Sequence, residues 1–146
     1  MELFEEIDIL LVEDSPNDAE LAIRALKKRG FANKMLWVKD GEQAINYLFR
    51  LGEYSQQHDE TSPKLVLLDL KMPRVDGMEV LRAIKQDQRT RRIPVVILTS
   101  SQEERDLTLS YDLGVNSYVV KPMDFDEMAD VVCQAGSYWL TVNRTP

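Results

Sequence analysis

The stretch "LVLLDLKMPRVDG" occupies residues 65–77 and leads four apolar residues directly into the carboxylate of Asp69. A loop that contains Pro73 and an Asp-Gly pair follows at once. Burying an isolated carboxylate is unfavourable unless the group is paired, hydrogen-bonded or bound to a metal. We therefore expect Asp69 to end a buried strand, at an edge of a sheet where other polar groups gather.

Five short apolar runs, rich in Val, Ile and Leu, are spread along the chain. Three of them barely alternate apolar with polar residues, which is typical of strands buried on both faces of a parallel sheet. Longer segments with helical spacing separate the runs. Strand and helix thus alternate five times, which predicts an open, doubly wound α/β sheet. The runs are 7–12, 34–38, 65–68, 95–99 and 117–120.

Capping residues indicate where the intervening helices begin and end. Ser15 precedes a proline, and Ser101 and Glu104 have the spacing of a capping box. The helices are expected to begin near Ser15, Asp40, Gly77, Ser101 and Asp124, and glycines close three of them at Gly30, Gly52 and Gly114. The fifth helix carries an apolar stripe that we expect to face the sheet, made of Met128, Val131, Val132, Ala135 and Trp139.

Length and charge exclude several classes of protein. The 146 residues predict one domain, residues 1–146, with its core between 7 and 140. The net charge of −7 argues against nucleic-acid binding, which needs a positive field. No apolar stretch reaches the roughly 18 residues of a membrane helix, and no signal region opens the chain, so a cytoplasmic protein without membrane contact is expected.

Four features are less informative on their own. Cys133 falls within an apolar pattern and is expected in the core rather than as a nucleophile. His58 is the only histidine, so a histidine metal site or a Ser-His-Asp triad has little to build on. The basic cluster at 89–94 is interpreted as a solvated turn. The long segment 52–64 is either a partner-binding loop or an insertion.

Residues that could bind a metal ion or take part in a reaction lie at the ends of the predicted strands. In an open α/β sheet the ligand site lies beyond the carboxyl ends of the strands. Crowded carboxylates repel one another unless one is protonated or a cation binds, and oxygen ligands without histidine favour Mg²⁺. A carboxylate beside Mg²⁺ can attack a phosphoryl group. The alternative is that these acids merely cap helices. The residues are Glu13, Asp14, Asp69, Thr99 and Lys121.

Four motifs together resemble the receiver domain of the two-component response regulators. They are "LLVEDSPND", "LVLLDLKMPRVDG", "IPVVILTSS" and "SYVVKP", in the order and spacing of that family. The resemblance covers residues 7 to about 140. It implies a flavodoxin-like (βα)5 fold with strand order 2-1-3-4-5.

The resemblance also implies a role for each matching residue. Asp69 resembles the phosphoacceptor, which takes a phosphoryl group from a sensor histidine kinase. Asp14, Asp69 and the backbone carbonyl of Lys71 resemble direct Mg²⁺ ligands, and Glu13 would act through a metal-bound water. Lys121 resembles the ammonium that binds the phosphoryl group.

Two further implied roles concern the conformational change on phosphorylation. Thr99 resembles the switch hydroxyl that is drawn to the phosphoryl group. Tyr118 resembles the aromatic residue that then moves inward, although Tyr118 could also simply pack. The Lys121–Pro122 bond matches a cis peptide of the family, although an ordinary trans turn is the alternative. A protein of this kind promotes its own Mg²⁺-dependent phosphorylation and dephosphorylation and is not otherwise an enzyme.

The last residues favour one subgroup and a mode of output. We expect no output domain after the fifth helix, so the signal would pass by protein contact. The 52–64 segment and the tail "GSYWLTV" resemble single-domain regulators of phytochrome-type sensor kinases. An aromatic seam in the tail predicts a homodimer that is built on the fourth helix, fifth strand and fifth helix, whereas the alternative is a tail that folds back over its own sheet. The seam residues are Tyr138, Trp139, Leu140 and Val142.

Other functions fit less well. A phosphatase of the haloacid-dehalogenase type needs a second aspartate two residues after the nucleophile, where this chain has Lys71. A receiver-like module that binds no phosphate would have lost one of the matching residues. A flavin- or nucleotide-binding protein would carry a glycine-rich loop after the first strand, and none is present.

Overall fold

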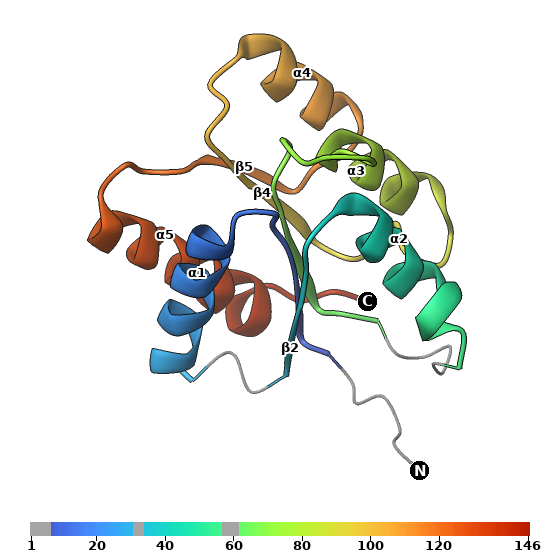
Figure 1. Cartoon of the computed structure of the whole chain (residues 1–146), viewed down its shortest axis with the longest axis horizontal. Coiled ribbons are helices and arrows are strands. Elements are labelled where there is room, and N and C mark those ends of the chain that lie inside the picture. The colour runs from blue at the N-terminus through green and yellow to red at the C-terminus, as the bar shows by residue number, and fades with distance from the viewer. Residues whose placement is uncertain (1–6, 31–33, 57–61) are drawn as a thin grey trace.

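The computed structural model of the chain describes residues 7–30, 34–56 and 62–146. Its centre is one parallel sheet with strand order β2-β1-β3-β4-β5, as predicted. Figure 1 shows helices on both faces, with α1 and α5 on one side and α2, α3 and α4 on the other. The strands are β1 (Ile9–Val12), β2 (Met35–Val38), β3 (Leu65–Leu68), β4 (Val95–Thr99) and β5 (Ser117–Val120).

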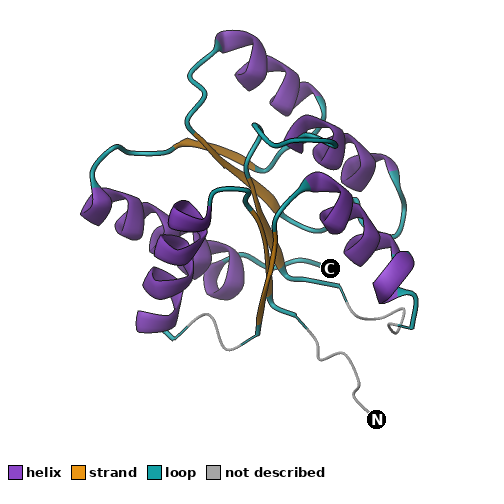
Figure 2. Ribbon diagram, viewed as in Figure 1, coloured by secondary structure: helices purple, strands orange, loops and turns teal. Residues whose placement is uncertain are grey.

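Burial explains why three strands lack alternation in the sequence. Every residue of β1, β3 and β4 is buried, because helices cover both faces of the central strands. The outer strands β2 and β5 are mostly half-buried. Figure 2 shows the strands as a twisted layer between the helices.

The helices begin close to the expected caps. Ser15, Asp40 and Asp124 each accept a hydrogen bond from a backbone N–H in the first turn of the helix that follows. Asp76, rather than Gly77, caps the third helix in a capping box with Glu79. The helices are α1 (Pro16–Lys28), α2 (Gly41–Phe49), α3 (Gly77–Gln86), α4 (Glu104–Asp112) and α5 (Phe125–Ser137), with a short 3₁₀ turn at Gly52–Tyr54.

The capping box predicted for α4 is wrong. Glu103 is the N-cap of α4 and its side chain makes no capping bond. The Ser101 hydroxyl instead donates to the Asp106 carboxylate at 2.6 Å and accepts from the Glu103 backbone N–H at 3.3 Å. A carboxylate is a stronger acceptor than a neutral partner, so Ser101 is held in the turn that precedes the helix.

The apolar core is split into two clusters by the sheet. One lies under α2 and α3 and includes Tyr47, Leu81 and Ile84. The other lies under α1 and α5 and includes Leu26 and the predicted α5 stripe, in which Met128 and Val132 are buried and Val131, Ala135 and Trp139 pack at the margin. Cys133 is buried, as expected of a core residue.

The tail continues α5 as a π-helical turn, Tyr138–Val142. Trp139 and Leu140 pack against the cluster under α1 and α5, whereas Tyr138 and Val142 are 49% and 65% exposed. The tail thus turns Trp139 and Leu140 toward the protein's own core, and the aromatic seam stays a prediction. His58 and residues 57–61 of the long segment lie outside the described residues. No helix in the described ranges is long and apolar enough to cross a membrane.

Candidate functional site

The predicted site residues meet at the carboxyl edge of the sheet. Backbone hydrogen bonds between neighbouring strands hold them there: the Asp69 N–H donates to the Val12 carbonyl at 3.0 Å, and the Lys121 N–H to the Thr99 carbonyl at 2.7 Å. The strand ends are thus positioned by the sheet rather than by their side chains. This is the arrangement expected when four parallel strands end at one edge.

Three carboxylates form the centre of this edge. One oxygen each from Glu13, Asp14 and Asp69 lies within 4.8 Å of the other two. Glu13 and Asp69 are 3% and 7% exposed, whereas Asp14 faces solvent. Oxygen donors with one side open to water fit a hard divalent cation such as Mg²⁺ or Mn²⁺, which keeps several waters.

Lys121 compensates the charge of these acids. Its Nζ lies 2.7 Å from Glu13 Oε1, 2.8 Å from Asp18 Oδ2 and 3.2 Å from Asp69 Oδ2. The Lys121 side chain is 10% exposed, so the contacts are largely shielded from water. Sequence reasoning missed Asp18, which lies in the first turn of α1. The acidic run "EDSPND" places Asp18 four residues after Asp14, but no local pattern indicates its contact with Lys121.

Burial and charge shift the pKa values in this cluster. Burial, reinforced by the negative charge of Asp69, raises the pKa of Glu13 to about 7, and the hydrogen bond from Lys121 opposes this rise. For Lys121, burial disfavours the ammonium, but hydrogen bonds to Asp18 and Glu13 and the charge of Asp69 outweigh it and raise its pKa. Lys121 is therefore a permanent cation, and Glu13 changes charge near neutral pH.

Thr99 and Tyr118 are joined through one intervening residue. Thr99 is fully buried, and its Oγ1 accepts a hydrogen bond from the Ser101 N–H at 3.3 Å. The Tyr118 hydroxyl donates to the Ser101 carbonyl at 3.1 Å. Burial raises the pKa of Tyr118, which keeps its hydroxyl protonated. Both side chains thus contact the loop between β4 and α4.

The loop after Asp69 turns tightly over the site. Its Lys71 N–H donates to Asp69 Oδ1 at 3.4 Å, while the Lys71 ammonium lies 3.5 Å from Asp106 on α4. A Cβ atom at Gly77 would lie 2.0 Å from the Asp69 carbonyl oxygen, so this position needs glycine. A shallow cavity of about 360 Å³ opens here, lined by Asp14, Leu70, Lys71, Met72, Pro73 and Asp76.

The peptide bond between Lys121 and Pro122 is trans, so the cis bond expected from the resemblance is wrong. An X–Pro bond favours trans by about 0.5–1 kcal/mol unless its surroundings select the other isomer. Lys121 reaches the carboxylates from this trans backbone.

The family model for the response regulator receiver domain matches residues 9–133. The match covers most of the chain and includes all five strands. The protein therefore belongs to the response regulators of two-component signal transduction.

Individual relatives narrow this class. Over 138 residues the chain is 45% identical to the probable methanogenesis regulatory protein FilR2 of Methanothrix harundinacea, which covers 94% of this chain and 86% of that protein. It is 40% identical, also over 138 residues, to the response regulator Rcp1 of Synechocystis sp., covering 94% of this chain and 92% of Rcp1.

Solved structures agree with these relatives. The crystal structure of the phosphorylated cyanobacterial phytochrome response regulator RcpA matches with a TM-score of 0.89 at 38% identity, covering 97% of this chain and 99% of that one. The Mn²⁺-bound form of Rcp1 matches with a TM-score of 0.88 at 39% identity, covering 96% and 99%. The fold is the flavodoxin-like receiver fold, and the chain is a homologue of phytochrome response regulators.

Proposed function

We propose that Asp69 is the residue that accepts the phosphoryl group from a sensor histidine kinase. The observation that carries this proposal is the position of the Asp69 carboxylate, which is buried at the end of β3 and lies 3.2 Å from the Lys121 ammonium. In the reaction an Asp69 oxygen attacks phosphorus as the bond to the kinase histidine nitrogen breaks, which leaves an acyl phosphate. Lys121 neutralises charge on the transferred oxygens.

The carboxylate cluster would hold Mg²⁺. Asp14, Asp69 and the backbone carbonyl of Lys71 are the proposed direct ligands, and Glu13 would act through a bound water. The three carboxylates lie close enough together to share one ion, and the homologous Rcp1 has been crystallised with Mn²⁺. When bound, the cation screens the negative charge that otherwise repels an incoming phosphoryl group.

Thr99 and Tyr118 would report the phosphorylated state. A Thr99 hydroxyl that turns toward a phosphoryl oxygen must give up its contact with the Ser101 N–H. Tyr118 is bonded to the carbonyl of the same Ser101, so its position depends on the same loop. We propose that a shift of this loop passes the signal to the surface around α4 and β5.

The partners would be proteins in the cytoplasm. Met123 and Phe125, between Lys121 and the body of α5, are 103% and 68% exposed, and exposed apolar side chains beside the reactive site suit kinase docking. Similarity to Rcp1 and RcpA favours a phytochrome-type kinase. We further propose that two copies form a homodimer, with the exposed Tyr138 in the contact.

Intact-mass measurement after incubation with Mg²⁺ and acetyl phosphate tests the proposed acceptor. The wild-type protein should gain one phosphoryl group, and Asp69→Asn should gain none while keeping its melting temperature within a few degrees. Asp112→Asn, which removes a carboxylate from the exposed end of α4, is the matched control and should be phosphorylated normally. Phosphate that still appears on Asp69→Asn would place the acceptor elsewhere.

A further inference from the structure

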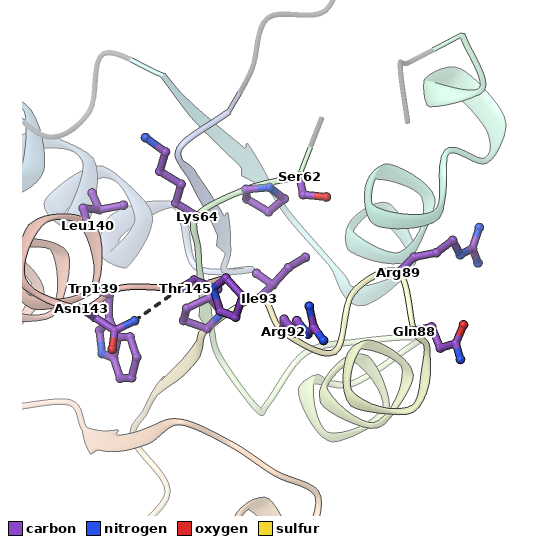
Figure 3. Close-up of a pocket in the computed structure, with 13 residues that line it drawn as sticks. Ser62, Lys64, Gln88, Arg89, Arg92, Ile93, Trp139, Leu140, Asn143 and Thr145 are labelled. Atoms are coloured by element: carbon purple, nitrogen blue, oxygen red, sulfur yellow. Dashed lines mark hydrogen bonds between the residues drawn. The ribbon is translucent and has the colours of Figure 1, made fainter. Parts of the chain in front are cut away.

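A second cavity lies at the opposite edge of the sheet from the carboxylate cluster. It has a volume of about 560 Å³ and is formed where the segment entering β3, the loop between α3 and β4, and the tail after α5 meet (Figure 3). Sites for small molecules have volumes of roughly 300–1,000 Å³. The cavity is therefore large enough for a ligand, and none of its lining residues belongs to the proposed phosphorylation site.

The charged side chains that line this cavity are all basic, whereas the whole chain has a net charge of −7. Lys64, Arg89 and Arg92 contribute positive side chains, and none of its described lining residues is Asp or Glu. The whole chain has 25 acidic and 18 basic residues, so a wall with three basic and no acidic side chains departs from the average surface. In Figure 3, Arg92 lies between Lys64 near the tail and Arg89 at the far end of the loop.

The three cations differ in how far their charges are already compensated. Arg89 makes two hydrogen bonds to Asp87 and stacks on the ring of Phe49 at 5.1 Å. Lys64 forms a long ion pair with Asp8 at 3.6 Å. The exposed Arg92 side chain makes no hydrogen bond or ion pair with any residue in the described ranges. Its guanidinium keeps all its donors available for a ligand.

Apolar and neutral polar groups complete the wall. Trp139 and Leu140 reach the cavity from the tail, and Ile93 from the loop. Asn143 and Thr145, which bond to each other at 3.4 Å, add an amide and a hydroxyl. The exposed wall is more polar than apolar, and a few apolar side chains beside several hydrogen-bonding groups suit a small organic molecule that is held mainly through a charged group.

We propose that this cavity binds a small organic anion, a molecule with a phosphate or carboxylate group and an apolar or planar body. Arg92 contacts the anionic group, and Trp139 packs against the body. A bound molecule would bridge the tail to the loop between α3 and β4, two segments that enter the cavity from different parts of the chain. The site is independent of phosphoryl transfer at the other edge of the sheet.

Fluorescence titration of the full chain tests this site. A Trp37→Phe background leaves Trp139 as the only tryptophan, because the chain has two. ATP, inorganic pyrophosphate and citrate are titrated in EDTA, with adenosine as the uncharged counterpart of ATP. We expect saturable binding of at least one anion at millimolar concentration or below and none of adenosine. Comparing the affinities for ATP and pyrophosphate with that for citrate shows whether the site prefers a phosphate or a carboxylate group. No saturable binding of any anion would overturn the proposal.

Charge variants locate the binding. Arg92→Gln should weaken the binding of the anion about tenfold, because it removes a charge-assisted hydrogen bond. Arg82→Gln removes an exposed charge from α3 outside the cavity and should leave the affinity within about twofold, which is the spread expected for general screening. Asp69→Asn should have no effect. Equal losses in Arg92→Gln and Arg82→Gln, or a loss in Asp69→Asn, would show that the anion binds elsewhere.

Discussion

Lys121 separates three acidic side chains that would otherwise repel one another. Replacing it by Met leaves buried carboxylates without a counter-charge. We expect Lys121→Met to lower the free energy of unfolding by about 3–5 kcal/mol in EDTA at pH 8. Urea denaturation measures this loss, and Mg²⁺ should restore part of it.

The matched control for Lys121 is Lys28→Met, which removes an exposed charge from the last turn of α1. Its effect should stay within about 1 kcal/mol, as for other surface charges. Equal stability of the two variants in EDTA would mean that Lys121 does not compensate the cluster.

Glu13 predicts how pH acts on the metal-free protein. Its pKa is raised from 4.5 to about 7, so the folded state holds a proton that the unfolded state releases between these values. The stability contributed by this proton is fully present below pH 4.5 and is lost as the pH rises through 7. Thermal unfolding in EDTA from pH 5 to 8 should show this loss in the wild type and less of it in Glu13→Gln. Identical curves would contradict the assignment.

The same proton competes with a metal ion. A cation needs the ionised carboxylate, so the affinity for Mg²⁺ should fall as the pH drops from 8 to 6. Calorimetric titration with Mg²⁺ at several pH values measures the change. Glu13→Gln should bind Mg²⁺ more weakly but with less dependence on pH in this range. An affinity that does not change with pH in the wild type would exclude proton competition at Glu13.

At the scale of elements, the turn between β3 and α3 leaves no room at Gly77. A Cβ atom there would lie 2.0 Å from the Asp69 carbonyl oxygen and 2.6 Å from Leu70 Cα. Gly77→Ala must therefore displace the backbone that carries Asp69. We expect a loss of at least about 2 kcal/mol in the free energy of unfolding and a lower phosphorylation rate.

Gly30→Ala is the matched control for this turn. Gly30 has φ +81°, but a Cβ atom added there would meet no other atom within 4 Å, so the variant tests backbone strain without a clash. Its cost should be about 1 kcal/mol, and phosphorylation should be unchanged. A smaller loss in Gly77→Ala than in Gly30→Ala would show that the turn can relax.

The bounds of a helix or strand could be predicted from the sequence where a single physical cause determines them. The three central strands are buried on both faces, so their apolar runs end where the strands end. The α4 capping box failed because spacing alone does not reveal a competing acceptor, and Asp106 takes the Ser101 hydroxyl. The contact of Asp18 with Lys121 joins residues 103 positions apart, which no local pattern records. Tail packing likewise depends on where α5 ends relative to the sheet.

At the scale of the whole molecule, the tail divides its apolar residues between the core and the surface. We expect Tyr138→Ser with Val142→Ser to convert the proposed dimer to a monomer without lowering the melting temperature, because both side chains are exposed. Trp139→Ala should instead cost about 2 kcal/mol in stability, roughly half the value for a fully buried aromatic residue. Sedimentation and thermal unfolding measure the two effects. A double variant that remains dimeric would place the contact elsewhere.

The number of hydrogens on the Lys121 ammonium limits how many groups it can bond at once. An ammonium group has three hydrogens, and each already faces one carboxylate, on Glu13, Asp18 and Asp69. A newly arrived phosphoryl oxygen can gain a hydrogen from Lys121 only if one acid gives its own up. Asp18 is the most exposed of the three at 39%, so water can replace Lys121 there at least cost. Phosphorylation at the end of β3 is therefore expected to release Asp18, in the first turn of α1, from Lys121. A change at one side chain would in this way alter the start of a helix that follows a different strand.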